Sequence, residues 1–359
     1  MGITEERLSL DDVLLVPQRL TFSSRFNGDI DLSMQLLPGL PYMKYPIVSA
    51  NMDTVTESRM ANKMNELGGL GIVHRFMDIK DHEKEIFRIE REPRILCIGV
   101  GGHSKERFDA IIKGRDKTYI QGVLIDVAHG HSNAVIDRII EVKEARPDLP
   151  VIAGNVATYQ GTRDLLQAGA DCVKVGVGPG SLCTTRIKTG CGVPQLTAIM
   201  DALTAVNDWF SIELEGKSPE GVWKPTLIAD GGIKNSGDIV KALAAGASAV
   251  MIGALFAGTD ETPGRVVNFP GKGRMKEYRG MASREAQESW KGRASSIEGE
   301  MTFKPYKGSM ENVFNELISG VLSGMSYQNA RNIRELQKHA DFRKITSAGW
   351  KESLPHGTF

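Results

Sequence analysis

Cysteine is scarce in this chain of 359 residues, which contains four. Cys97, Cys172, Cys183 and Cys191 form no CxxC pair and lie in no histidine-rich cluster, so the sequence argues against a zinc site and a disulfide scaffold. Thiols this sparse are consistent with the reducing conditions of a cytoplasm.

The chain also lacks an excess of either charge, because 44 lysines and arginines balance 44 aspartates and glutamates. A neutral chain offers no global attraction to nucleic acid or to an anionic membrane. Apolar runs are short, and none approaches the roughly 18 residues that a membrane helix requires. Residues 1–20 are charged and lack the apolar core of a secretion signal. We therefore expect a cytoplasmic protein that binds neither nucleic acid nor membranes.

Glycine, in contrast, is abundant at 39 residues, and much of it follows short apolar runs. Eight such runs are predicted to be strands, at 46–50, 70–73, 95–100, 123–127, 151–154, 172–175, 226–230 and 249–253. Apolar residues recur at helical spacing between them, at 132–145, 159–168, 195–206 and 235–245. Short apolar strands that alternate with amphipathic helices predict a parallel sheet covered by helices, and eight units match a closed (β/α)8 barrel.

A doubly wound open sheet is the alternative architecture. Polar and glycine-rich residues follow nearly every predicted strand, which favours a barrel, where all these loops lie at one end, over an open sheet with one switch point. We therefore predict an α/β protein whose residues 1–359 form a single (β/α)8 TIM-barrel catalytic domain. The charged, weakly periodic stretch 272–307 is predicted to be an extended loop that acts as a lid before a final helix near 310–324. Residues 208–223 are predicted to be a second irregular insertion.

Residues 176–192 are predicted to form the active-site loop, because they place Cys183 among glycines, hydroxyl groups and an arginine. Thr184, Thr185 and Arg186 adjoin this cysteine, and a nearby cation favours the thiolate, which is the reactive form. The loop glycines permit backbone angles that turn N–H and C=O groups towards a ligand. A buried, inert cysteine is the other interpretation, and the residues alone leave both open.

Glycine motifs follow the last two predicted strands, as Asp230-Gly231-Gly232 and as Gly253. In such barrels these positions commonly hold a phosphate, with glycine N–H groups and helix N-termini as donors. The carboxylate of Asp230 can accept hydrogen bonds from sugar hydroxyls. Two adjacent motifs favour a phosphorylated substrate over the alternative that each is a simple turn.

The loop sequence GVGPGSLCTTRIKTGCGVPQLTA resembles the active-site loop of the IMP dehydrogenase and GMP reductase family. The resemblance extends over almost the whole chain, through LSLDDVLLVP, ANMDTV, GGLGIVHR, GNVAT, ADGGIKNSGDIVKALAAGASAVMIG, YRGM and ITSAGWKES. It implies a homotetrameric (β/α)8-barrel oxidoreductase with a purine nucleotide substrate and a nicotinamide cofactor. It also implies that Cys183 attacks purine C2 to give a covalent intermediate.

The resemblance assigns the other site residues as well. It implies that the nucleotide is held by Met52, Ser181, Asp230, Gly231, Gly232, Gly253, Tyr278, Gly280, Met281, Arg293 and Gly299. It implies that the cofactor side is lined by Asp126, Val127, Ala128, Asn155 and Gly176. Carbonyl groups of Gly178, Gly180 and Cys183 would bind a monovalent cation, with K+ as the expected ion.

The lid sequence separates the two enzymes of the family. Dehydrogenases carry an Arg-Tyr pair that activates water, and no such pair occurs between Met281 and Glu298. The segment from Arg293 to Gly299 instead resembles the RASEG segment of GMP reductases with two extra residues, and its Glu298 would pair with Thr185 to manage the proton on departing ammonia. The regulatory CBS domains that dehydrogenases usually insert after the second strand are also absent.

We therefore predict an NADPH-dependent GMP reductase with Cys183, Thr185 and Glu298 as catalytic residues. The barrel motifs AHGHS, GVPQLTA and DGGIKNSGDI look more like a dehydrogenase, so an NAD-dependent IMP dehydrogenase with an atypical short flap is the alternative. A purine-nucleotide-binding regulatory protein without turnover is a third interpretation, and the intact Cys183-Thr184-Thr185 triplet argues against it.

Overall fold

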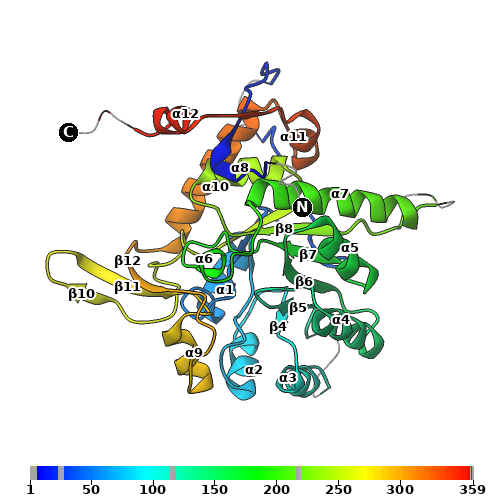
Figure 1. Cartoon of the computed structure of the whole chain (residues 1–359), viewed down its shortest axis with the longest axis vertical. Helices are drawn as coiled ribbons and strands as arrows, with labels where there is room; N and C mark the ends of the chain where they lie inside the picture. Colours follow the sequence, from blue (N-terminus) through cyan, green and yellow to red (C-terminus); the bar gives the residue numbers. More distant parts are fainter. Residues whose placement is uncertain are drawn as a thin grey trace.

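Eight parallel strands form the central sheet of the computed structural model, which describes residues 6–22, 28–113, 119–215, 218, 220–355 and 357 (Figure 1). The strands are β2 (Ile47–Ser49), β3 (Leu70–Gly71), β4 (Ile95–Ile98), β5 (Gly122–Asp126), β6 (Val151–Val156), β7 (Cys172–Val175), β8 (Thr226–Asp230) and β9 (Ala249–Ile252). Each lies within or beside one of the eight predicted runs. Their hydrogen-bonded order is β3-β2-β9-β8-β7-β6-β5-β4, as expected for a sheet that curls on itself.

The two ends of this order, β3 and β4, are consecutive in sequence, and their following residues meet. A methyl group built on Gly99, after β4, would lie 2.9 Å from Cζ of Arg75, after β3. The sheet therefore curves round until its ends approach. The α/β (β/α)8 TIM-barrel prediction is confirmed.

Helices cover the outside of the sheet. They are α1 (Ser58–Glu66), α2 (Ile79–Phe87), α3 (Gly102–Lys113), α4 (Asn133–Ala145), α5 (Tyr159–Gln167), α7 (Gln195–Glu213), α8 (Ser236–Ala244) and α10 (Met310–Tyr327). Several of these helices have a side-chain N-cap. Asp78, Thr158 and Asn235 accept hydrogen bonds from backbone N–H groups in the first turns of α2, α5 and α8. No helix in the described part of the chain is long and apolar enough to cross a membrane.

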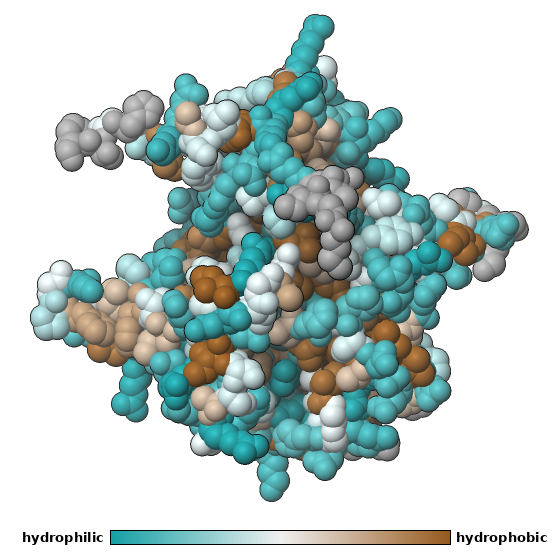
Figure 2. All heavy atoms as spheres, in the orientation of Figure 1, coloured by the Kyte–Doolittle hydropathy of each residue, from teal (hydrophilic) through white to brown (hydrophobic). Residues whose placement is uncertain are grey.

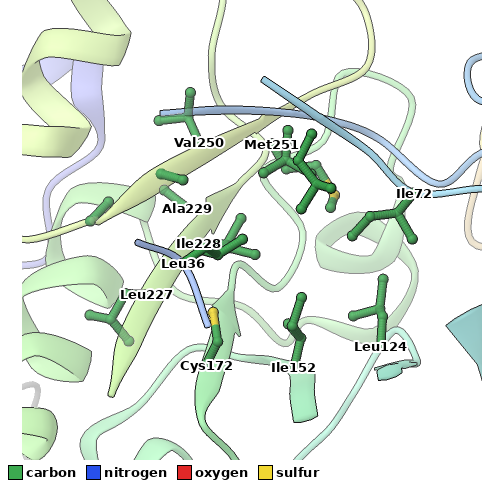
Figure 3. Packing of buried hydrophobic residues seen from close by; sticks show 14 of the residues in the cluster. Leu36, Ile72, Leu124, Ile152, Cys172, Leu227, Ile228, Ala229, Val250 and Met251 are labelled. Atoms are coloured by element: carbon green, nitrogen blue, oxygen red, sulfur yellow. The ribbon is translucent and has the colours of Figure 1, made fainter. Parts of the chain in front are cut away.

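Apolar side chains from the strands fill the barrel interior (Figure 3). Leu124, Ile152 and Ile228 project from β5, β6 and β8 and are buried. Leu36, from the segment before β2, packs beside them and is tied to the N-terminal end of β8, because the hydroxyl of Thr226 donates to its carbonyl at 2.6 Å. Since this end is closed, access to the barrel is from the C-terminal ends of the strands.

The prediction that 272–307 forms an extended loop is wrong, because most of this segment is regular secondary structure. Strands β10 (Val267–Phe269), β11 (Gly273–Arg279) and β12 (Met301–Pro305) form an antiparallel sheet that projects from the barrel, and α9 (Arg284–Lys291) follows β11 (Figures 1 and 2). The inward positions of β11 alternate as a strand requires, but one is Lys276, which is buried and donates to the carbonyls of Thr259 and Thr262. A charged inward residue conceals the alternation that identifies a strand.

The predicted irregular insertion 208–223 is also partly wrong, because α7 continues to Glu213. No glycine or proline interrupts the sequence before that point, so the helix extends past the last core-facing turn. Trp209 packs against the core, and the Trp223 indole donates to the Asp171 carbonyl at 3.1 Å. These two aromatic side chains thus anchor both ends of the segment to the barrel. Gly216, Lys217 and Pro219 lie outside the described residues.

The two ends of the described chain pair with each other. After the 3-10 turn η1 (Leu10–Asp12), strand β1 (Val13–Leu15) runs antiparallel to β13 (Phe342–Lys344), which lies between α11 (Ile333–His339) and α12 (Ser347–Glu352). Lys234, in the loop after β8, contacts Asp11 and lies over the Trp350 ring. Both terminal segments therefore pack near the open end of the barrel.

Candidate active site

A cavity of about 820 Å³ opens at the C-terminal ends of the strands and continues beneath the lid. Its size is typical of a site for a drug-sized or larger ligand. The predicted site residues that line it are Met52, Asp126, Val127, Ala128, Asn155, Gly180, Ser181, Cys183, Thr185, Asp230, Gly231, Gly232, Gly253, Tyr278, Gly280, Met281, Glu298 and Gly299. The structure therefore brings together residues separated by more than 240 positions in sequence.

Three predicted residues do not line this cavity. Gly176 is buried below it, with its N–H bonded to the Val156 carbonyl, and Gly178 lies against Arg186. Arg293 is exposed on the lid.

The reactive centre of the cavity is a hydrogen-bonded row of three side chains. The thiol of Cys183 lies 3.1 Å from the Thr185 hydroxyl, which in turn lies 2.8 Å from Oε2 of Glu298. All three are partly buried and face the cavity. In such a row the nucleophile can form a bond to a substrate, while the hydroxyl and the carboxylate move a proton within the same site.

Backbone pairing between loop and lid puts this row in place. The N–H of Thr184 donates to the Glu298 carbonyl at 2.9 Å, and the N–H of Glu300 donates to the Leu182 carbonyl at 3.0 Å. Cys183 and Gly299 form an antiparallel bridge between these two bonds. The lid therefore adds a short strand to the active-site loop, and Glu298 enters the site through that pairing.

Arg186 stabilises the loop rather than the thiol. It belongs to the short helix α6 (Thr185–Thr189), and its guanidinium donates to the carbonyls of Val177 and Val193 at 3.3 and 2.6 Å. These carbonyls lie at the two ends of the loop. Arg186 therefore joins the ends, and no hydrogen bond within the described residues directs it at Cys183.

One part of the cavity wall is rich in hydroxyls and glycines. The hydroxyls of Ser181 and Tyr278 lie 3.3 Å apart, and burial raises the pKa of Tyr278 although Ser181 partly offsets this. A methyl group on Gly253 would lie 3.2 Å from the Tyr278 oxygen and 3.3 Å from the Met52 sulfur. Glycine is therefore needed there for a ligand to approach the backbone.

A buried charge cluster forms the floor, and its central member, Lys174, is absent from the sequence prediction. Nζ of Lys174 lies 2.7 Å from Asp126 Oδ1 and 2.5 Å from Asp230 Oδ2. Burial acts to lower the pKa of Lys174, but the two carboxylates raise it above its ordinary value. Burial acts to raise the pKa of Asp126, and Lys174 together with Arg75 and Asn51 brings it below its ordinary value. A lysine inside an otherwise apolar strand was the signal that could have identified this residue.

Aromatic rings form a third wall, which sequence reasoning also missed. Phe76 packs edge-on against Trp290 of α9 at 5.4 Å, and the guanidinium of Arg75 lies 4.6 Å from the Phe76 ring. The indole N–H of Trp290 and the side-chain oxygen of Asn155 are buried without a hydrogen-bond partner in the described structure. Both residues line the cavity, so a bound ligand can supply the missing partners.

Known proteins are similar to this chain over nearly its whole length. The model of the IMP dehydrogenase / GMP reductase domain matches residues 7–356. Inosine-5'-monophosphate dehydrogenase of Borreliella burgdorferi is 36% identical over 416 aligned positions, covering 99% of this chain and 98% of the relative. The corresponding enzyme of Aquifex aeolicus is 34% identical and covers 98% of this chain and 96% of its own.

A solved structure is similar over the same length. It is a variant of GMP reductase from Trypanosoma brucei in complex with guanosine 5'-monophosphate, with a TM-score of 0.89, 25% identity and coverage of 99% of both chains. These two sequence relatives are thus dehydrogenases, whereas this structural relative is a reductase.

Proposed function

Because the chain belongs to the IMP dehydrogenase / GMP reductase family, we propose that it is a GMP reductase, which converts GMP to IMP and ammonia with NADPH. The observation that carries this choice is the row from Cys183 through Thr185 to Glu298, with hydrogen-bond distances of 3.1 and 2.8 Å. A carboxylate beside the nucleophile suits a reaction in which an amino group must leave with a proton.

In the proposed reaction the Cys183 thiol passes its proton through Thr185 to the Glu298 carboxylate, and the resulting thiolate forms a bond to C2 of GMP as the C2=N3 π bond opens onto N3. The bond from C2 to the amino nitrogen then breaks, and Thr185 and Glu298 deliver the proton with which that nitrogen leaves as ammonia. The product is a covalent thioimidate on Cys183. NADPH, when bound, supplies the hydride that C2 must gain. Cys183 then departs as a thiolate when the C2–S bond breaks, and IMP is released.

The residues of the cavity fit both ligands. Asp230 lines the cavity with an Oδ1 that has no hydrogen bond in the described chain, which suits ribose hydroxyls, and the backbone N–H groups of Gly231, Gly232 and Gly253 suit a phosphate. The unpartnered side-chain oxygen of Asn155 suits the amide N–H groups of a nicotinamide. Asp126, Val127 and Ala128 would line that side.

An NAD-dependent IMP dehydrogenase is the second candidate, and the identity of up to 36% to enzymes of that name favours it. That reaction needs a base to activate water. No arginine between Met281 and Glu298 is followed by tyrosine, so another residue would have to take that part.

We further propose a K+ ion bound by carbonyl groups of Gly178, Gly180 and Cys183, and a homotetrameric assembly. The Gly180 carbonyl accepts the N–H of Cys183 at 3.0 Å and retains a second lone pair. Replacement of K+ by a large organic cation should lower turnover if the ion orders the loop, and equal rates in both salts would reject the ion. Light scattering would test the assembly.

The test of the main proposal uses nicotinamide absorbance in two mixtures of the purified protein, one with GMP and NADPH and one with IMP and NAD. Loss of absorbance in the first alone is expected. A rise in the second alone would make the protein a dehydrogenase. No change in either, together with tight nucleotide binding, would support a binding protein without turnover.

A further inference from the structure

Lys174 is a charged residue in a place where charge is costly. It lies in the middle of β7, its side chain is 3% exposed, and its strand neighbours Val173 and Val175 are fully buried. An ammonium group is stable there only when opposite charges surround it. Two carboxylates, from the ends of β5 and β8, meet that need.

The ammonium determines which carboxylate oxygens remain available. Asp126 uses Oδ1 for Lys174 and Oδ2 for the amide of Asn51, at 2.7 and 2.9 Å. Asp230 uses Oδ2 for both Lys174 and the amide of Asn155, at 2.5 and 2.9 Å. Within the described chain, Oδ1 of Asp230 is therefore the one carboxylate oxygen of this cluster without a hydrogen bond. Asp230 lines the cavity and its side chain is 23% exposed, so Oδ1 is the oxygen left for a ligand.

The two carboxylates are close enough to repel each other strongly, since each touches the same nitrogen atom. The other charged or titratable groups around them do not remove that conflict. Arg75 donates to the backbone carbonyl of Asp126 at 3.2 Å, while burial raises the pKa values of the Cys97 thiol, to about 12, and of the Tyr278 phenol. The thiol and the phenol therefore stay neutral near neutral pH.

We propose that Lys174 is a positioning residue, whose ammonium holds Asp126 and Asp230 together as one charge-neutralised unit and directs Oδ1 of Asp230 at the nucleotide. The inference rests on the proposed function and deepens it, because it identifies Lys174 as the residue that orients Asp230, the carboxylate proposed to bind the ribose. It does not depend on which of the two family reactions the protein catalyses.

The charge unit predicts a pH dependence that appears only when the ammonium is removed. In K174M the two buried carboxylates lose the cation that both of them contact and keep only Arg75, beside Asp126, so the folded state favours a shared proton and the pKa of one of them rises. Stability is then fully present at low pH and is lost as pH rises through that raised value. The melting temperature of unliganded K174M should therefore fall relative to the wild type as pH rises from about 4, the ordinary pKa of a carboxyl group, towards neutral pH.

The charge-compensated variant K174M/D126N supplies the sharpest comparison, because it removes one of the repelling carboxylates. Its melting temperature should follow the wild-type pH profile, and so should that of K174R, which keeps the cation. GMP and IMP binding at pH 7, measured by calorimetry, should weaken by roughly 10-fold or more in K174M and recover at least partly in K174M/D126N. K143M, which removes a similar contact between Lys143 and Asp171 at 2.7 Å, is the matched control and should leave nucleotide binding unchanged.

Equal pH profiles for K174M and K174M/D126N would overturn the proposal. The loss of melting temperature in K174M would then not come from repulsion between the carboxylates of Asp126 and Asp230. Failure of both variants to fold would also overturn the proposal. An insoluble K174M beside a soluble K174M/D126N would support the proposal. Failure of the proposed function is separate, because melting and nucleotide binding are measured without turnover.

Discussion

Cys183 is set apart from the other three cysteines by what surrounds its sulfur. Cys97 and Cys172 are fully buried, and burial raises the pKa of each thiol to about 12, so they remain protonated and inert. Cys191 is exposed, and its thiol lies near a backbone carbonyl of Thr189. Cys183 alone combines partial exposure to the cavity with a hydroxyl at 3.1 Å.

Replacement of Cys183 by alanine should abolish turnover and leave nucleotide binding within about threefold, since the side chain supplies a bond rather than a binding surface. Initial rates and calorimetric titration with GMP measure the two effects. C191A is the control, with full activity expected. Substantial turnover by C183A would exclude the covalent mechanism.

Glu298 is the residue on which the choice of reaction depends. Glu298→Gln keeps the shape of the side chain and its bond to the Thr185 hydroxyl, but it can no longer take or give a proton. The rate of ammonia release should fall roughly 100-fold or more. E300Q, two residues away at an exposed position outside the cavity lining, should leave the rate unchanged. Equal rates for the two variants would remove Glu298 from the mechanism.

The sequence identified this row because all three members lie in segments that resemble a known family. It did not identify Lys174, for a physical reason. The partners that make a buried lysine stable, Asp126 and Asp230, lie 48 residues before it and 56 residues after it. In the sequence, such a lysine is only one polar position in an apolar run. The folded sheet is needed to show that its neighbours are carboxylates.

At the scale of elements, the loop after β7 is held by close backbone contacts that only glycine permits. Gly176 has a φ of +147°, and a methyl group on it would lie 2.1 Å from the Asp230 carbonyl oxygen. The segment that begins the active-site loop thus packs directly on the end of β8. This contact fixes the distance between the thiol loop and the floor of the cavity.

Gly176→Ala should therefore destabilise the protein by about 2 kcal/mol or more, because backbone strain adds to a steric overlap. Gly190, in the same loop, also has a positive φ of +72°, but nothing lies within 4 Å of a methyl group there. G190A should cost only about 1 kcal/mol, from strain alone. Urea unfolding of both variants measures the difference, and similar losses would contradict the packing argument.

The lid shows where element prediction failed. Strand β11 hides its alternation because Lys276 occupies an inward position, and the pairing of residues near Glu298 with the active-site loop joins segments over 110 positions apart. Neither feature has a local signal. The sheet of this segment was therefore not predictable from its composition, and its role as a lid stays a prediction.

At the scale of the molecule, the barrel was predictable because each strand is a short apolar run followed by glycine or polar residues. Eight such runs appear in the sheet, and helices follow most of them. The pairing of β1 with β13 was not predictable, since Val13 and Lys344 lie at opposite ends of the chain and neither strand exceeds three residues. Contacts of this kind depend on the completed barrel to bring the two ends together.

Stability of the whole molecule should decrease in mild acid because of a buried histidine on α2. His82 is fully buried, and burial together with the charge of Arg107 holds its pKa well below the ordinary value of 6.5, although the Val73 carbonyl acts in the opposite direction. The unfolded chain binds a proton near pH 6.5 and the folded chain does not. The free energy of unfolding therefore falls as pH drops below that value, by up to about 1.4 kcal/mol per pH unit.

Urea unfolding at pH 7 and pH 5 measures this loss, and His82→Gln isolates it, because other groups titrate equally in both proteins. H82Q should be less stable than the wild type at pH 7, where it loses a packed ring, and should lose less stability between the two pH values. H103Q changes an exposed histidine whose side chain is 64% accessible, so it should follow the wild type at both pH values. A wild-type pH dependence in H82Q would show that the acid sensitivity comes from elsewhere in the barrel.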